Sequence, residues 1–388
     1  MSQAPAVLEQ DLSSRESRLE AVLENVRGRR GDIERGRCVP RDIVDGLVSA
    51  GLYRATVPQR FGGDGRPLSV SLRQIERISA VDPSVGWVAS FAPQGANYFG
   101  ALSPDRLAEI YADGPDVVGA GGLFPLQPAE RVPGGLRING RWKFGSGSLA
   151  ADWISVGVIV PGDEGATPPP RLIVLPAEKV DIVPNWETVG LSGTGSHDLV
   201  VRDVVMAEDW SFVRGGAPQS DDVICRFPAM ALAACAFAVV GLGAARGALD
   251  AAIDVAAGKT SITGGPRLAD KAYVQHAIAK AEAALGAARA FLYEQVDGAW
   301  AAVEAGREVS PRDRMALRLA ANHASRAGVE VAQAAFAAVG TTAIFLDNPI
   351  QQFLRDALVV NQHAFLGEAN YEAGGRMLLG LPPSPGFP

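Results

Sequence analysis

The chain has 388 residues, of which 47% are hydrophobic and 20% charged, and its net charge is −7. Acidic and basic residues are mixed along it, so it lacks the basic stripe of a nucleic-acid-binding surface and we expect no nucleic-acid partner. Cys38, Cys225 and Cys235 are too widely spaced for a disulfide framework or a metal set, and the length suits two or three domains.

The first part of the chain, residues 1–115, is predicted to form a helical domain. No stretch reaches the roughly 18 apolar residues of a membrane-spanning helix without a break or a charge, and the N-terminus has no signal-peptide layout. We therefore expect a cytoplasmic protein that makes no membrane contact. Apolar periodicity and capping residues predict helices at 7–26, 40–50, 69–80, 84–99 and 103–111.

Residues 116–215 change to short β runs separated by Pro- and Gly-rich turns, the longest of which is 161–170. This pattern predicts a small all-β domain, a barrel or a sandwich. The expected strands are 117–121, 136–144, 153–160, 171–175, 180–183 and 199–206.

Residues 216–388 return to helices, which are long and rich in alanine. Short connections between such helices favour an antiparallel bundle. Four are expected, at 227–257, 269–305, 311–339 and 349–379.

One stretch inside the β region combines aromatic rings with hydroxyls. From Trp142 on, a period of two places Trp142, Phe144, Ser146 and Ser148 on one face, with Gly145 and Gly147 between them. Glycines let a backbone approach a large planar ligand closely. The alternative is an ordinary hairpin with an aromatic core pair.

The order of these three regions, together with four motifs, resembles the acyl-CoA dehydrogenase fold superfamily. The resemblance implies an α+β chain with an N-terminal helical domain, a middle β-barrel domain and a C-terminal four-helix bundle. It also implies a flavin cofactor and a homotetramer or homodimer. The motifs are Pro58–Gly65, Ile138–Phe144, Trp186–Ser196 followed by Asp203–Val205, and Leu354–Ala357.

The dehydrogenases of this superfamily need a carboxylate base to remove an α-proton. By counting from Leu354–Ala357, Ala364 falls where that base often stands, and residues 227–249 contain no Asp or Glu. Glu368 or Glu372 could still provide one, so an acyl-CoA dehydrogenase or oxidase stays as an alternative.

The chain is more similar to the oxygenase branch, the two-component flavin monooxygenases. Matching segments are Trp142–Trp153, Val81–Trp87 and Asn361–His363. The branch implies reduced flavin (FADH2 favoured over FMNH2), O2 as co-substrate, a flavin C4a-hydroperoxide and a small aromatic substrate. Since no nicotinamide-binding G-x-G-x-x-G lies between a strand and a helix, reduced flavin must come from a separate NAD(P)H flavin reductase.

Phenol hydroxylases of this branch often carry a histidine that is absent from residues 90–98, which favours an indole-type ring over a phenol. An amine N-hydroxylase and a non-catalytic flavin-fold scaffold are further alternatives.

The resemblance assigns candidate residues to each task. Ser146, Asn361 and His363 are the catalytic candidates, and Phe91, Gln94 and Asn97 are the substrate-binding candidates. No Cys/His set has metal-ligand spacing, so no metal site is expected; His197 is expected in a loop. Candidates for binding the flavin are Trp142, Phe144, Ser146, Gly147, Ser148, Thr194, Gly195, Ser196 and Arg267.

Overall fold

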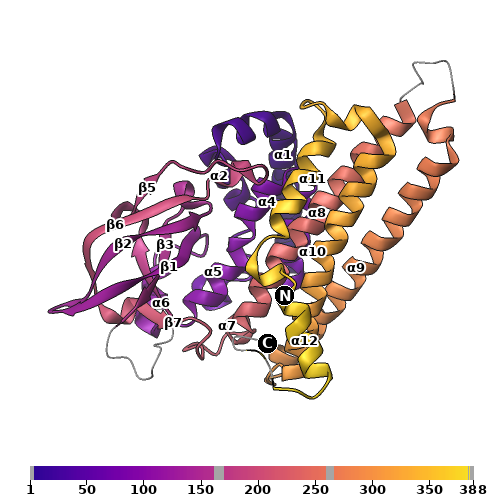
Figure 1. Cartoon of the computed structure of the whole chain (residues 1–388). Coiled ribbons are helices and arrows are strands. Elements are labelled where there is room, and N and C mark those ends of the chain that lie inside the picture. The colour runs from indigo at the N-terminus through magenta and orange to yellow at the C-terminus, as the bar shows by residue number, and fades with distance from the viewer. Residues whose placement is uncertain (1–3, 161–169, 259–265, 383, 385–388) are drawn as a thin grey trace. The chain divides into compact units, whose positions relative to one another are not determined.

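The computed structural model describes residues 4–160, 170–258, 266–382 and 384 (Figure 1). Contacts divide the chain into two compact units. The first unit comprises Met1–Pro67, Phe91–Glu187 and Ser192–Ala229, and the second comprises Leu68–Ser90, Thr188–Leu191 and Met230–Pro388. Residues 68–90, which the sequence places with the N-terminal helices, therefore pack with the C-terminal ones.

The first unit combines helices with the sheet. Its longest helix, α1, is longer than the expected 7–26, and it packs on α2, which buries Ile43, Val44 and Leu47. The helices are α1 (Ala4–Gly36), α2 (Arg41–Ser49), α5 (Phe91–Phe99), α6 (Pro104–Ile110) and α7 (Val223–Arg226).

A seven-stranded sheet forms the rest of the first unit (Figure 1), in the order β5-β6-β2-β1-β3-β4-β7. It is mixed, because β1 and β3 run parallel while the other neighbours are antiparallel. The strands are β1 (Gly119–Val132), β2 (Gly135–Gly145), β3 (Trp153–Ile159), β4 (Arg171–Pro176), β5 (Asp181–Val183), β6 (His197–Met206) and β7 (Ser211–Val213).

Strand β1 is much longer than the expected 117–121. Pro125 and Pro128 favoured a turn in its second half, because proline has no backbone N–H to donate to a neighbouring strand. The structure accommodates them with a register shift between Gly122 and Gln127, after which β1 pairs with β2 as a hairpin.

The second unit is helical, and its long helices α8, α9 and α10 lie side by side with α11 (Figure 1). Alanines of α8 and α10 pack with Phe353 and Ala357 in its core. The elements are α3 (Leu68–Ser79), α4 (Pro83–Ala89), α8 (Ala229–Gly258), α9 (Ala272–Glu304), α10 (Pro311–Val339), α11 (Pro349–Val360) and α12 (Ala369–Leu378).

Two expected helices are interrupted. The helix expected at 84–99 is divided into α4 and α5 at Ser90, because Pro93 has no N–H to continue the α4 ladder. The helix expected at 349–379 is divided into α11 and α12 by a turn that contains a short 3₁₀ segment, Ala364–Leu366.

Helices α8 and α10 are long and apolar enough to span a membrane by length and composition. The most apolar window of α8 is 83% buried inside the protein, as expected of a core helix.

Two of the sequence motifs meet in the second unit. The backbone N–H of Leu191 donates to Asp356 Oδ1 at 2.6 Å, and Arg355 donates to the carbonyl of Val189 at 2.5 Å. The Leu354–Ala357 motif thus fixes the backbone of the Trp186–Ser196 motif through these two hydrogen bonds.

Candidate active site

The hydroxyl cluster, which we define as Ser146, Thr194 and Ser196, lies at the end of β2. The hydroxyl oxygens of Ser146 and Ser196 are 2.5 Å apart, and those of Thr194 and Ser196 are 2.7 Å apart. The N–H of Gly147 donates to the carbonyl of Thr194 at 3.0 Å. Left-handed backbone at Gly147 and Gly195 shapes the two turns. Two segments some 50 residues apart, each of which contains flavin-binding candidates, therefore meet.

Ser148 follows directly and differs from this cluster. Its side chain is 3% exposed, and within the described ranges its Oγ has no hydrogen-bond partner. A buried hydroxyl without a partner is unfavourable, so native proteins rarely keep one unless a ligand or water completes it. The residues present thus fit a flavin, whose ring edge carries hydrogen-bonding atoms.

The aromatic residues of β2 do not share a face, and this part of the prediction is wrong. Trp142 is 0% exposed, and its indole N–H donates to the carbonyl of Gly157 at 2.7 Å, so it belongs to the core. Phe144 is 59% exposed. The strand alternation ends because β2 has a register shift before Gly145 and Phe144 has a φ of 66°.

The exposed ring of Phe144 is the one that can contact a planar ligand. The edge of Trp186 lies against it, with ring centroids 6.1 Å apart and planes at 83°. Together the two rings and the unpartnered Ser148 hydroxyl match an isoalloxazine, which is planar and carries polar edge atoms.

His197 is placed differently from the expected loop position. It begins β6, is buried, and its Nδ1 accepts the backbone N–H groups of Asn185 and Trp186, each at 3.1 Å. Burial lowers the pKa of its imidazole. His197 thus holds the Trp186 segment. Sequence reasoning missed this role, for which the one available signal was its position beside the Thr194–Ser196 turn.

Arg267 lies in the second unit and is exposed, and its guanidinium pairs with Asp270 at 3.1 Å. Gly264 and Gly265, which precede it in the expected motif, fall outside the described residues. The predicted part of Arg267 in flavin binding therefore stays a prediction. In the described part of the chain, no three His, Cys, Asp or Glu side chains gather as a metal site would require.

The aromatic cluster, which we define as Trp87, Phe237, His363 and Phe365, lies in the second unit. The His363 ring centroid is 4.4 Å from that of Phe237, 5.0 Å from that of Phe365 and 5.7 Å from that of Trp87. Trp87 and Phe237 stack at 4.4 Å. His363 Nδ1 accepts the N–H of Phe365 at 3.2 Å, so the neutral imidazole carries its proton on Nε2.

The Val81–Trp87 motif positions Trp87. Asp82 caps α4 by accepting the N–H groups of Ser84 and Val85 at 2.8 and 3.1 Å. A Cβ at Gly86 would lie 1.8 Å from Ser79 Oγ, so glycine is needed for α4 to approach α3.

The other C-terminal candidates fall in the turn between α11 and α12. Asn361 Oδ1 accepts the hydroxyl of Ser325 at 3.0 Å. Glu368, an alternative dehydrogenase base, is exposed and paired with Arg326, and Glu372 is exposed as well. Neither is placed in a buried site, where a carboxyl group becomes a stronger base.

The substrate-binding candidates Phe91, Gln94 and Asn97 lie on α5, which belongs to the first unit, whereas the aromatic cluster belongs to the second. The Asn97 amide donates to the carbonyls of Ile224 and Phe227 at 2.7 and 2.9 Å. Its observed contacts therefore hold α5 to α7.

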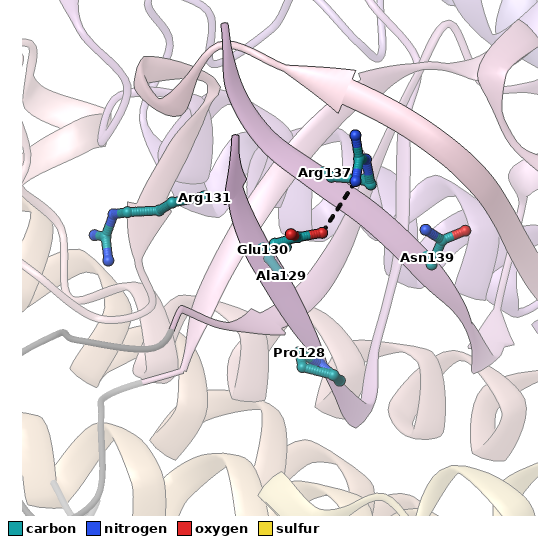
Figure 2. A pocket seen from close by; sticks show the side chains of 6 residues that line it. All are labelled: Pro128, Ala129, Glu130, Arg131, Arg137 and Asn139. Atoms are coloured by element: carbon teal, nitrogen blue, oxygen red, sulfur yellow. Dashed lines mark hydrogen bonds and ion pairs between the residues drawn. The ribbon is translucent and has the colours of Figure 1, made fainter. Parts of the chain in front are cut away.

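A pocket of about 400 Å³ lies on the β1–β2 hairpin (Figure 2). Its charges are matched internally, because Arg137 lies 3.1 Å from Glu130 and 3.2 Å from Asp203. This pocket is at the opposite end of β2 from the hydroxyl cluster, and we assign it no part in the chemistry.

Comparisons with known proteins identify the family of the chain. Residues 235–368 match the acyl-CoA dehydrogenase C-terminal domain family. The chain is 48% identical to an indole-3-acetate monooxygenase of Pseudomonas putida over 95% of each chain. It is 29% identical to the oxygenase component of an FADH2-dependent resorcinol hydroxylase of Rhizobium sp. over 94% of each.

Among solved structures, a 3-HSA hydroxylase from Rhodococcus sp. RHA1 superimposes with a TM-score of 0.88, at 25% identity, over 95% of this chain and 97% of that one. The fold is therefore acyl-CoA dehydrogenase-like, with helices and a mixed sheet. The named relatives are oxygenases. The chain thus belongs to the two-component flavin-dependent aromatic monooxygenases, the oxygenase branch of the acyl-CoA dehydrogenase fold.

Proposed function

We propose that this monooxygenase hydroxylates indole-3-acetate. The observation that carries the proposal is the 48% identity over 95% of the chain with an indole-3-acetate monooxygenase. The side chains of the aromatic cluster suit an indole, because flat rings in offset or edge-on contact bind aromatic substrates favourably.

The first unit supplies the residues for the flavin. Ser148 would donate its unpartnered hydroxyl to the ring edge, and Phe144 would pack against the ring. The hydroxyl cluster would hold the adjoining turn in place. When bound, reduced flavin supplies the two electrons with which O2 is activated. We propose FADH2 as the physiological form, in keeping with the FADH2-dependent relative.

The second unit supplies residues for the substrate. Because His363 Nδ1 is engaged with the backbone, its Nε2–H can donate to an acceptor on the substrate or transfer a proton. Asn361 would keep the turn that carries His363 in place through Ser325.

The partners follow from the family. A separate NAD(P)H flavin reductase would deliver the reduced flavin. We propose a homotetramer or homodimer in the cytoplasm, since Ile344, Phe345 and Leu346 together expose an apolar surface that a second copy could cover. Light scattering at micromolar concentration tests the assembly, and a monomer mass would contradict it.

Turnover with a generic flavin reductase tests the function. The full chain, NADH, FAD, catalase and indole-3-acetate should give a product heavier by one oxygen atom, labelled by ¹⁸O2. FMN in place of FAD should give less product. If no oxygenated product forms and an acyl-CoA reduces the bound flavin, the protein is a dehydrogenase instead.

A further inference from the structure

Three polar residues form a stripe along the buried face of α10. Arg318, Asn322 and Ser325 follow the spacing i, i+4, i+7 that places side chains on one face of a helix. All three are buried, Arg318 with 4% and Asn322 with 0% exposure, among alanines and leucines. Burying a guanidinium and an amide is costly unless polar groups compensate them, so such residues are seldom placed in a helix interface by chance.

The turn between α11 and α12 lies along this stripe. Arg318 donates to the amide oxygen of Asn370, and its guanidinium carbon is 5.2 Å from the Phe365 ring centroid. Ser325 donates to Asn361 at the other end of the stripe. His363 and Phe365, two members of the aromatic cluster, belong to the segment between these contacts.

Asn322, at the middle of the stripe, provides an independent observation. Its amide is close enough to the Tyr371 hydroxyl to affect that group's pKa, but in the described part of the chain neither amide atom completes a hydrogen bond. A wholly buried amide in this state is rare in native proteins. A polar group of a ligand would account for it.

A buried cation and a buried amide thus adjoin a set of aromatic rings. We propose that Arg318 binds the carboxylate of an aromatic substrate with an acidic side chain, and that Asn322 donates its amide N–H to the same group. The proposal rests on the proposed function and deepens it, since it makes the negative charge of the substrate a requirement for efficient binding.

The geometry of a guanidinium suits this task. The guanidinium carbon lies over the Phe365 ring, and a carboxylate can bind in the plane of a guanidinium through two parallel N–H groups. A site built to bind a carboxylate also discriminates against neutral analogues, because they lack the attraction between the two charges.

Wild-type selectivity is the first test. Equilibrium dialysis of the full chain should show binding of indole-3-acetate about 100-fold tighter than binding of the neutral isostere indole-3-acetamide. Equal affinity for the two would overturn the proposal. Because dialysis needs no turnover, this result stands even if the hydroxylation proposed above is absent.

Arg318→Gln is the second test, with Arg326→Gln as the matched control. Arg326 is on the same helix about two turns away, and it is exposed and paired with Glu368. Arg318→Gln should weaken indole-3-acetate binding about 100-fold and raise KM more than it lowers kcat, while indole binding changes less than about threefold. Arg326→Gln should change neither.

An equal loss for indole and indole-3-acetate in Arg318→Gln would show a structural residue and contradict the proposal. Should that variant not fold, Asn322→Ala gives the same comparison, with about a tenfold loss expected for indole-3-acetate alone. The proposal would be wrong if Asn322→Ala kept the wild-type preference for indole-3-acetate over indole and the wild type bound indole-3-acetate and indole-3-acetamide equally.

Discussion

The two clusters are built in different ways. The hydroxyl cluster of the first unit comes from two short segments, each a recognisable motif, that are joined by hydroxyl contacts and one backbone hydrogen bond. The aromatic cluster of the second unit comes from three elements: α4 and α8 supply one side chain each, and the turn before α12 supplies two. We expect the hydroxyl cluster to depend on its hydrogen bonds more than on side-chain packing. We expect the aromatic cluster to depend on packing more than on any single hydrogen bond.

The largest effect is expected from Phe237→Ala. Phe237 is buried between Trp87 and His363, so truncation should lower the free energy of unfolding by about 3–5 kcal/mol. Denaturant titration measures the loss. Phe291→Ala, a truncation of a more exposed phenylalanine on α9, should lose less than about 1.5 kcal/mol.

The same variant separates the clusters chemically. Since Phe237 does not belong to the hydroxyl cluster, Phe237→Ala that still folds should keep consuming O2 and NADH with reductase present. The oxygen should then appear as hydrogen peroxide instead of hydroxylated product. Because free reduced flavin also reacts with O2, the deciding measurement is anaerobic binding of reduced flavin, and loss of that binding in a folded Phe237→Ala variant would count against this division of tasks.

The difference also explains what the sequence could reveal. The hydroxyl cluster was predictable because Ser146, Thr194 and Ser196 stand in contiguous motifs that match a family. The exposure of Phe144 was not, because the strand period gives no warning of a left-handed residue inside it. Likewise, residues 361–367 contain no proline and one glycine only, Gly367, so the sequence gives little sign of a break and predicts one helix where there are two.

The stripe on α10 was missed for a related reason. In a sequence, Arg318 looks like any exposed arginine of a long helix, and three arginines of α10 lie within eight residues of it. Burial alone distinguishes it, and burial depends on which face the neighbouring helices cover. By contrast, apolar periodicity and caps predicted three of the four bundle helices closely, since α8, α9 and α10 lie near their expected ranges.

Ser148→Ala should have the next largest effect. Its hydroxyl lacks a partner among the described residues, whereas Ser146 is bonded to Ser196. Losing a donor to the flavin costs on the order of 1–3 kcal/mol, or about ten- to a hundred-fold in the lifetime of the oxygen-activating state. Product formed per O2 consumed should fall accordingly.

Ser146→Ala provides the comparison within the same turn. It removes a contact inside the hydroxyl cluster, so coupling should fall less than in Ser148→Ala. If Ser146→Ala instead has the larger effect, Ser146 is the flavin donor that the family motif suggests. If both keep wild-type coupling, neither hydroxyl contacts the flavin.

His197 gives the first unit a dependence on pH. Burial keeps the pKa of His197 in the folded chain below the ordinary value of about 6.5. At pH values between these two pKa values, His197 is protonated in the unfolded chain and neutral in the folded chain. The contribution of His197 to stability is therefore fully present above about pH 6.5 and is lost as pH falls from there towards the folded pKa. Thermal unfolding of His197→Gln should show a smaller decrease over this range than wild type.

His276→Gln is the control for replacing a histidine, because His276 is exposed on α9 and its replacement should leave the free energy of unfolding at neutral pH nearly unchanged. At neutral pH, His197→Gln should also cost about 1 kcal/mol, since the N–H groups of Asn185 and Trp186 lose their acceptor. An identical pH dependence in wild type and His197→Gln would contradict the assignment.

The smallest effect is expected at the hairpin pocket of Figure 2, where the side chain of Arg137 is 40% exposed. Its ion pairs with Glu130 and Asp203 are solvent-exposed, and such pairs contribute about 0.2–1 kcal/mol. Arg137→Gln should therefore lower stability by less than about 1 kcal/mol, less still at high salt, and leave product formed per O2 consumed unchanged. A fall in that ratio as large as in Ser148→Ala would indicate that the reaction depends on the start of β2 and not on its end. The assignment of separate tasks to the two clusters would then be wrong.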